Sequence, residues 1–167
     1  MFENALDKKT KKSLLNLKYL SYIFVVATIG LGFIFSTYTA YKLLVSYSEL
    51  KTQTIMWLII SYVVSFMVIW GIYDVIRLLN NLYKGNIFTY ENADILKIID
   101  KKIIFTIIFS TIANVVMTLM NGNPIWFLLV WFVFIIFLVV GHILVYPLAL
   151  LVRKSADLQI EMELTIW

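Results

Sequence analysis

The chain has 167 residues, of which 62% are hydrophobic and 14% are charged, against about 45–50% and about 25% in soluble domains. A soluble protein of this length could not bury so much apolar surface, so the composition predicts a protein surrounded by lipid. The chain has no cysteine and one histidine, so disulfides, thiolate chemistry and cysteine-bound metals are excluded, and we expect no metal and no cofactor.

Four apolar stretches are long enough to cross a membrane as helices, which takes about 20 residues each. They cover residues 20–41, 55–76, 103–120 and 125–151. None shows the alternation of barrel strands, and the first is too long for a cleaved signal peptide. We therefore predict an all-α fold, an integral membrane four-helix bundle that forms one domain over residues 1–167.

The net charge of +4 reflects how lysine and arginine are placed relative to the bilayer. Twelve of these fourteen residues precede the first span, lie between the second and third, or follow the fourth. By the positive-inside rule, both termini and the central connection are cytoplasmic, and helices two and three project into the cytoplasm. Direct nucleic-acid binding is not expected, because no recognition motif is present.

The central connection, residues 77–102, is called the elbow. Gly85 suits the left-handed residue that ends a helix, and Thr89 suits the cap of the next one. Glu91 lies in the first turn, where negative charge is favoured, and Phe88 is expected to pack back onto the new helix. From residue 89 to residue 102, charged side chains fall on one helix face and apolar ones on the others, which predicts an amphipathic helix that leads into the third span.

Two readings of the elbow stay open. It either only closes a helical hairpin, or it presents the Asn86–Asn92 face to a cytoplasmic protein. The outer connection N-G-N-P, by contrast, is a short turn in which Asn123 is expected to cap the fourth helix, with Pro124 at its first position.

Polar residues near the spans are functional candidates, because they are costly in hydrocarbon. They are Asp74, Arg77, Asn114 and His142. Asp74 and Arg77 are expected to form a same-helix ion pair, with a proton-sensing Asp74–His142 pair as the alternative. Asn114 is expected to bond across helices. Neither a Ser/His/Asp set nor a phosphate loop is present, so we expect no enzyme.

The tail, residues 152–167, fits two patterns. Apolar residues alternate with polar ones from Leu158 to Ile166, which favours a strand. Other residues of the tail are spaced so that they would share one face of a helix. The tail is therefore either a continued helix or an extended segment that pairs with a partner or docks on the elbow.

The stretch LLNNLYKGNIFTYENADILKIID resembles the K-G-N-x-F-T-x-E-N element of a bacterial four-span membrane family, catalogued as domain-of-unknown-function family 2975. The ending EMELTIW is similar to that family's acidic-Leu-Thr-Ile ending. The matching residues are Lys84, Gly85, Asn86, Phe88, Thr89, Glu91, Asn92, Glu163, Leu164, Thr165 and Ile166. Ile87 departs from the pattern, since the family usually has proline there. The resemblance implies a multi-pass protein of the bacterial cytoplasmic membrane, associated with small helix-turn-helix regulators.

We hypothesise a non-enzymatic sensor or regulatory partner that engages a cytoplasmic protein, such as a helix-turn-helix transcription regulator, through the elbow and tail. The alternative is a peptide-toxin or bacteriocin immunity protein, or a small-molecule efflux protein, that acts within the bilayer. Besides lipid and such a partner, the sequence also allows a homo-oligomer.

Overall fold

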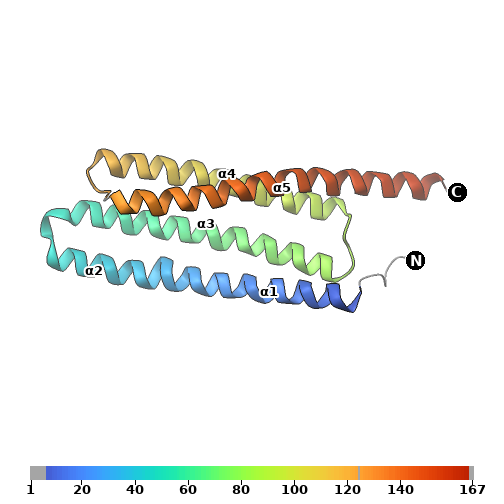
Figure 1. The fold of residues 1–167 in the computed structure, drawn as a ribbon, viewed down its shortest axis with the longest axis horizontal. Coiled ribbons are helices and arrows are strands. Elements are labelled where there is room, and N and C mark those ends of the chain that lie inside the picture. Colours follow the sequence, from blue (N-terminus) through green and yellow to red (C-terminus); the bar gives the residue numbers. More distant parts are fainter. Residues whose placement is uncertain (1–6, 124, 166–167) are drawn as a thin grey trace.

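A computed structural model describes residues 7–123 and 125–165, and this part of the chain is helical, without strands. The elements in chain order are α1 (Lys8–Thr28), the π-helix η1 (Ile29–Phe35), α2 (Ser36–Ser46), the 3₁₀ turn η2 (Ser48–Leu50), α3 (Lys51–Tyr83), α4 (Tyr90–Leu119) and α5 (Ile125–Thr165). Because α1, η1 and α2 run without a break, they form one rod, and the described chain comprises four long helices (Figure 1).

Each of these four helices is long and apolar enough to cross a membrane. The 33 residues of α3 correspond to about 50 Å of helix, whereas the hydrocarbon core of a bilayer is about 30 Å thick. The all-α prediction of four membrane helices is thus confirmed. The helices are longer than the predicted spans, which lie almost entirely within them.

The helices form an open bundle arranged as a row. Close backbone contacts join the first rod to α3, α3 to α4, and α4 to α5; within the described residues the first rod makes none with α4 or α5. Figure 1 shows the rod along one edge and the α4–α5 hairpin along the other. As an edge element, α1 has no buried residue.

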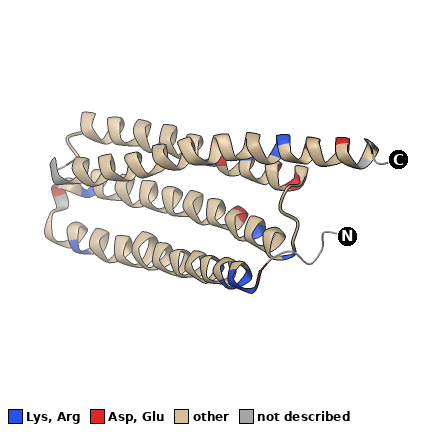
Figure 2. Ribbon diagram, turned by 45° about the vertical axis from the view of Figure 1, so that its right-hand side comes forward, with Lys and Arg blue, Asp and Glu red and all other residues tan. Residues whose placement is uncertain are grey.

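The exposed surface is large and apolar. The accessible area is 12061 Å², whereas a compact soluble protein of 19.5 kDa would expose about 8,500 Å². Side chains such as Ile34, Phe137 and Leu144 are more than 60% exposed, and Figure 2 shows charged residues concentrated toward the helix ends. Such a surface requires lipid rather than water as its solvent.

Small residues let the first rod approach α3 closely. Ser61 Oγ donates to the Gly32 carbonyl oxygen at 3.2 Å and lies 2.7 Å from Ser36 Oγ. A Cβ on Gly32 would lie 1.9 Å from Ser65 Oγ, so only glycine fits there. Close packing through small residues with hydrogen-bonding hydroxyls is typical of membrane helices.

At the opposite end of the bundle from the elbow, the α4–α5 turn is tight, as predicted. Asn121 has a positive φ of 54°, and Gly122 N–H bonds back to Met117 O at 2.9 Å, which closes α4. The predicted Asn123 cap is wrong: its Oδ1 is buried without a partner, and its Nδ2 reaches back to Asn114. Pro124 lies outside the described residues.

The tail is helical. α5 continues through Pro147 to Thr165 without interruption, so the extended alternative is wrong over the described part. Helix propagation adds one backbone bond for each residue ordered, whereas an isolated strand has no partner. α1 begins and α5 ends at the same end of the molecule as the elbow (Figure 1).

Candidate functional site

The elbow is held together by one asparagine. Asn92 is 1% exposed, and its Nδ2 donates to the carbonyl oxygens of Asn86 and Ile87 at 2.5 and 3.1 Å. Its Oδ1 accepts from Asn81 Nδ2 at 3.0 Å. Because one buried amide ties both sides of the turn to the end of α3, the elbow has a defined shape.

Local signals at the elbow act as predicted. Gly85 has φ 91°. Its N–H donates to Leu82 O, and Asn86 N–H donates to Asn81 O. These are the two hydrogen bonds of a Schellman motif. Thr89 Oγ1 accepts from Asn92 N–H at 3.2 Å, which caps α4.

Across the elbow, Arg77 and Glu91 form an ion pair between α3 and α4. The Nη2 and Oε1 atoms are 2.9 Å apart, and the side chains are about half exposed. Two hydrogen bonds lower the pKa of the Glu91 carboxyl: the one from Arg77 has the larger effect and the one from Asn81 the smaller. By linkage, its contribution to stability is present above the unfolded pKa near 4.5 and is lost as pH falls through the lower folded pKa.

The elbow leaves apolar side chains uncovered. Tyr83, Ile87, Phe88 and Tyr90 are 42, 36, 44 and 42% exposed; we call this set the elbow patch. Phe88 was expected to pack back onto α4, yet nearly half of it stays accessible. Large apolar groups that lie beyond the predicted spans are candidates for protein contacts.

A hydrogen bond joins the elbow to the tail. Tyr90 Oη donates to Asp157 Oδ1 at 2.5 Å, which connects the start of α4 to α5. This bond raises the pKa of the Tyr90 phenol, since it leaves the proton less free to dissociate next to a carboxylate. Beyond Asp157, Leu158, Met162 and Leu164 are 50, 59 and 74% exposed. The side chains of Glu163 and Thr165, and the whole of Ile166, lie outside the described residues.

Asp74 pairs with a residue of another helix. Its Oδ2 accepts from Lys102 Nζ, and the two side chains are only 10 and 14% exposed. The same ammonium donates to Trp70 O at 3.2 Å and lies 3.9 Å from the centroid of the Trp70 ring. The predicted Asp74–Arg77 ion pair is therefore wrong, because Lys102 from α4 reaches the buried carboxylate while Arg77 turns to Glu91.

His142 also finds a partner that the sequence analysis did not name. Its Nδ1 lies 2.6 Å from Asp100 Oδ1, with the Asp100 side chain 7% exposed. The alternative Asp74–His142 pair is thus wrong too. The hydrogen bond between His142 and Asp100 ties α4 to α5.

The spacing of Asp100 and Lys102 is compatible with contacts to two different helices, although it does not identify their partners. Two residues apart on a helix differ by about 200° in direction, so a helix placed between two others can send one to each neighbour. α4 does this, with Lys102 toward α3 and Asp100 toward α5.

Asn114 lies far from these pairs, near the opposite end of the bundle. Asn123 Nδ2 donates to its Oδ1 and its carbonyl oxygen, each at 3.0 Å, so the contact is with the turn between α4 and α5. The four predicted polar residues are therefore spread over separate contacts. No group of three His, Asp or Glu that could hold a metal occurs among the described residues.

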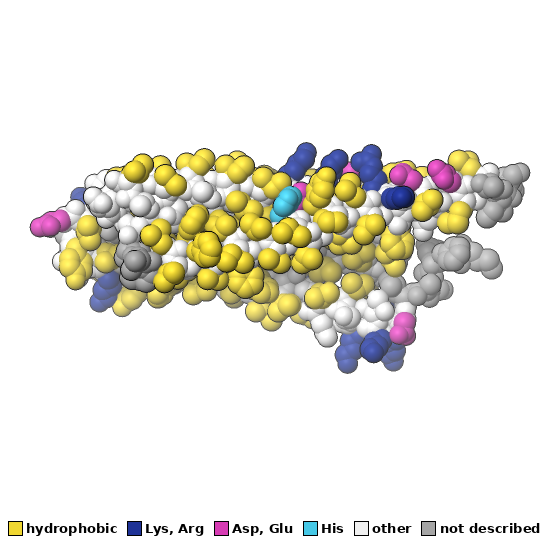
Figure 3. Space-filling view, turned by 45° about the horizontal axis from the view of Figure 1, so that its top comes forward, with side chains coloured by type: hydrophobic (Ala, Val, Ile, Leu, Met, Phe, Trp, Pro, Cys, Tyr) yellow, Lys and Arg dark blue, Asp and Glu magenta, His cyan; other side chains and the backbone are white. Residues whose placement is uncertain are grey.

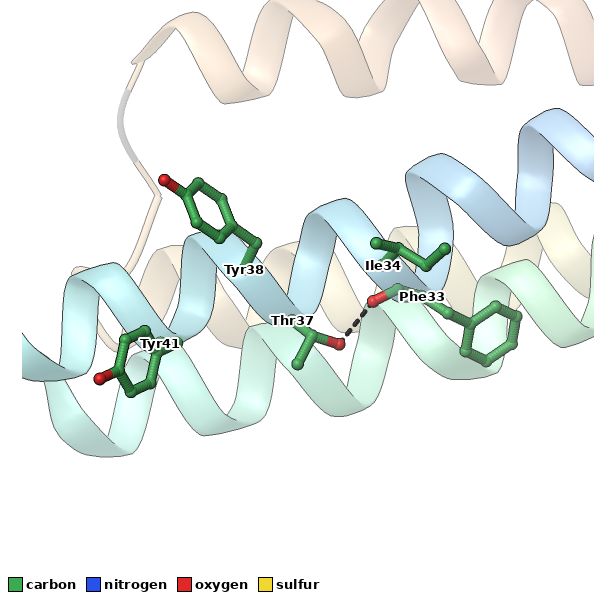
Figure 4. A pocket seen from close by; sticks show the side chains of 5 residues that line it. All are labelled: Phe33, Ile34, Thr37, Tyr38 and Tyr41. Atoms are coloured by element: carbon green, nitrogen blue, oxygen red, sulfur yellow. Dashed lines mark hydrogen bonds between the residues drawn. The ribbon is translucent and has the colours of Figure 1, made fainter.

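A shallow surface depression lies on the first rod. Figure 4 shows its lining: Phe33, Ile34, Thr37, Tyr38 and Tyr41. Thr37 Oγ1 donates to Phe33 O at 2.5 Å, and the lining carries no charged group. The depression is open and apolar, which suits lipid contact rather than catalysis.

Fold and surface together define a multi-pass α-helical membrane protein. The chain belongs to the family described as "Protein of unknown function (DUF2975)", whose model matches residues 5–166. The resemblance seen in the elbow and tail motifs is thereby confirmed. No curated protein and no solved structure gave a match.

Proposed function

We propose that this protein is a non-enzymatic membrane sensor or regulatory partner, which binds a cytoplasmic protein through the elbow and tail. The observation that carries the proposal is the rigid elbow patch, with Phe88 and Ile87 exposed on a turn fixed by Asn92. The Tyr90–Asp157 bond joins the start of α4 to the tail helix, which supports a binding surface shared by the elbow and the tail.

A rigid apolar patch suits binding. Little conformational entropy is lost when a turn is already ordered, and aromatic side chains often supply most of the binding energy of an interface. Charged neighbours such as Lys84, Glu91 and Asp94 are exposed around the patch and provide a polar rim.

The placement of lysine and arginine supports a cytoplasmic position for this surface. The family's association with small helix-turn-helix regulators supports a regulator of that class as the partner. A membrane protein that holds such a regulator would control how much of it is free to act on DNA.

The test is co-purification of cross-linked partner from native membranes. Replacing Phe88 and Ile87 together by serine should lower the recovered regulator about tenfold or more, as expected for hot-spot residues. Deleting residues 158–167 should lower the recovered regulator to a similar extent. Tyr47→Ser, which alters an even more exposed aromatic at the opposite end, is the matched control and should leave recovery unchanged. Equal recovery from all variants would contradict the proposal.

The Asp74–Lys102 and Asp100–His142 pairs favour a second candidate, an immunity or efflux protein that acts within the bilayer, since ionisable groups near the hydrocarbon often serve function. For that role, Asp74→Asn or His142→Gln would abolish a resistance phenotype, while loss of residues 158–167 would not.

A further inference from the structure

A narrow crevice separates α4 and α5 on the tail side of His142. Ala93 and Ala149 are 4 and 7% exposed and line its inner part. Lys97, Tyr146, Leu150 and Arg153 line it as well. The enclosed volume is about 30 Å³, the share of one water molecule in the liquid, so any larger ligand would lie across the mouth.

The mouth carries two positively charged side chains. Lys97 and Arg153 are both exposed and come from opposite sides of the crevice, and neither forms an ion pair within the described part of the chain. Asp100 also lines the crevice, but its carboxylate is engaged by His142. Two cations with one occupied carboxylate between them favour an anionic ligand.

Next to these cations the surface is strongly apolar. Tyr146 and Leu150 are 50 and 51% exposed, and Ile143 and Leu144 on the same helix are 60 and 65% exposed. Figure 3 shows Lys and Arg side chains gathered on this face with hydrophobic side chains beside them. Cationic and apolar surface in direct contact matches the two parts of a phospholipid.

We propose that this crevice binds an anionic phospholipid, with its phosphate between Lys97 and Arg153 and its acyl chains along α5. The Tyr146 hydroxyl is a further donor to the headgroup. Basic recesses between membrane helices at the cytoplasmic side bind lipid headgroups by this chemistry. The site goes beyond the proposed function, because it needs no protein partner and uses none of the elbow patch.

The experiment measures lipid retained by the purified full chain in detergent, by native mass spectrometry with phosphatidylglycerol or phosphatidylcholine added at equal concentration. The wild type should retain phosphatidylglycerol in preference. The double variant Lys97→Gln/Arg153→Gln should lose about tenfold or more of this preference, because each cation near an anionic headgroup adds to affinity. Lys101→Gln/Lys154→Gln, the matched control on the same helices with the same charge change, should stay within about twofold of wild type.

Equal losses in both double variants would mean general electrostatic attraction and would overturn the site, as would unchanged binding in the first. Displacement of phosphatidylglycerol by millimolar inorganic phosphate would overturn the lipid assignment in favour of a free-phosphate site. A photo-crosslinker in place of Leu150 keeps both cations and tests the site independently of the folding of the charge variants. It should form a phosphatidylglycerol adduct, and its failure to do so would contradict the proposal.

Discussion

Two residues of α4, Asp100 and Lys102, decide how three helices are held at the elbow end. Lys102 balances the charge of Asp74 from α3, and Asp100 bonds His142 from α5. Both carboxylates are buried. A buried charge is tolerated only with a partner, so each buried carboxylate must face its own partner when the helices pack. The exposed Arg77–Glu91 pair has no such constraint.

Lys102→Met should destabilise the protein by about 3–5 kcal/mol, because the buried Asp74 carboxylate loses its partner. Arg77→Met, which breaks an exposed pair, should change the free energy of unfolding by less than about 1 kcal/mol. Thermal unfolding in detergent measures both. The double variant Asp74→Leu/Lys102→Met should recover much of the loss; similar losses from Lys102→Met and Arg77→Met would show that burial does not set the difference.

At the scale of elements, η1 and α3 approach each other closely through small residues. The π-helix contains Gly30 and Gly32, which have different surroundings: a Cβ at Gly30 meets nothing within 4 Å, whereas one at Gly32 meets Ser65. The Gly32 carbonyl oxygen accepts from Ser61. Single wide turns of this kind occur often at functional positions in helices.

Gly32→Ala should destabilise the protein by about 1–3 kcal/mol, because the new Cβ would overlap Ser65 and force the helices apart. Gly30→Ala in the same π-helix is the matched control and should cause no loss. Both effects are read from the midpoint of thermal unfolding in detergent. Ser65→Gly added to Gly32→Ala should restore stability; if it does not, the clash with Ser65 is not the cause.

What could be predicted from the sequence depended on how far apart the interacting residues lie. Gly85 and Thr89 were correctly placed because helix stops and caps act over a few residues. The partners of Asp74 and His142 were missed because they lie 28 and 42 residues away, and nothing local selects them. Asn123 failed as a cap because its Nδ2 donates to Asn114, nine residues earlier, which holds the side chain toward α4.

At the scale of the whole molecule, the helices turn back and forth so that α1 begins at the elbow end and α5 extends past the elbow at that same end (Figure 1). Twelve of fourteen lysine and arginine residues lie in the segments at that end. Moving so many charges across a membrane is unfavourable. Both features agree with an orientation in which this end faces the cytoplasm.

Because the chain has no native cysteine, its orientation can be measured with single cysteine variants. Lys12→Cys, Lys84→Cys and Lys154→Cys should resist a membrane-impermeant maleimide in intact cells and react after lysis. Glu49→Cys, exposed at the opposite end, should react in intact cells. Labelling of Lys12→Cys and Lys84→Cys from opposite sides would refute the orientation.

The row of helices has a consequence for biosynthesis. Since close backbone contacts among residues 7–123 and 125–165 join each helix only to those next to it in the chain, a helix leaving the insertion machinery meets its packing partner already in the bilayer. Assembly of these backbone contacts can therefore proceed stepwise during translation, and the ring contact of Trp57 in α3 with Phe127 in α5 forms last. Such short-range pairing keeps loop-closure entropy low and favours rapid folding.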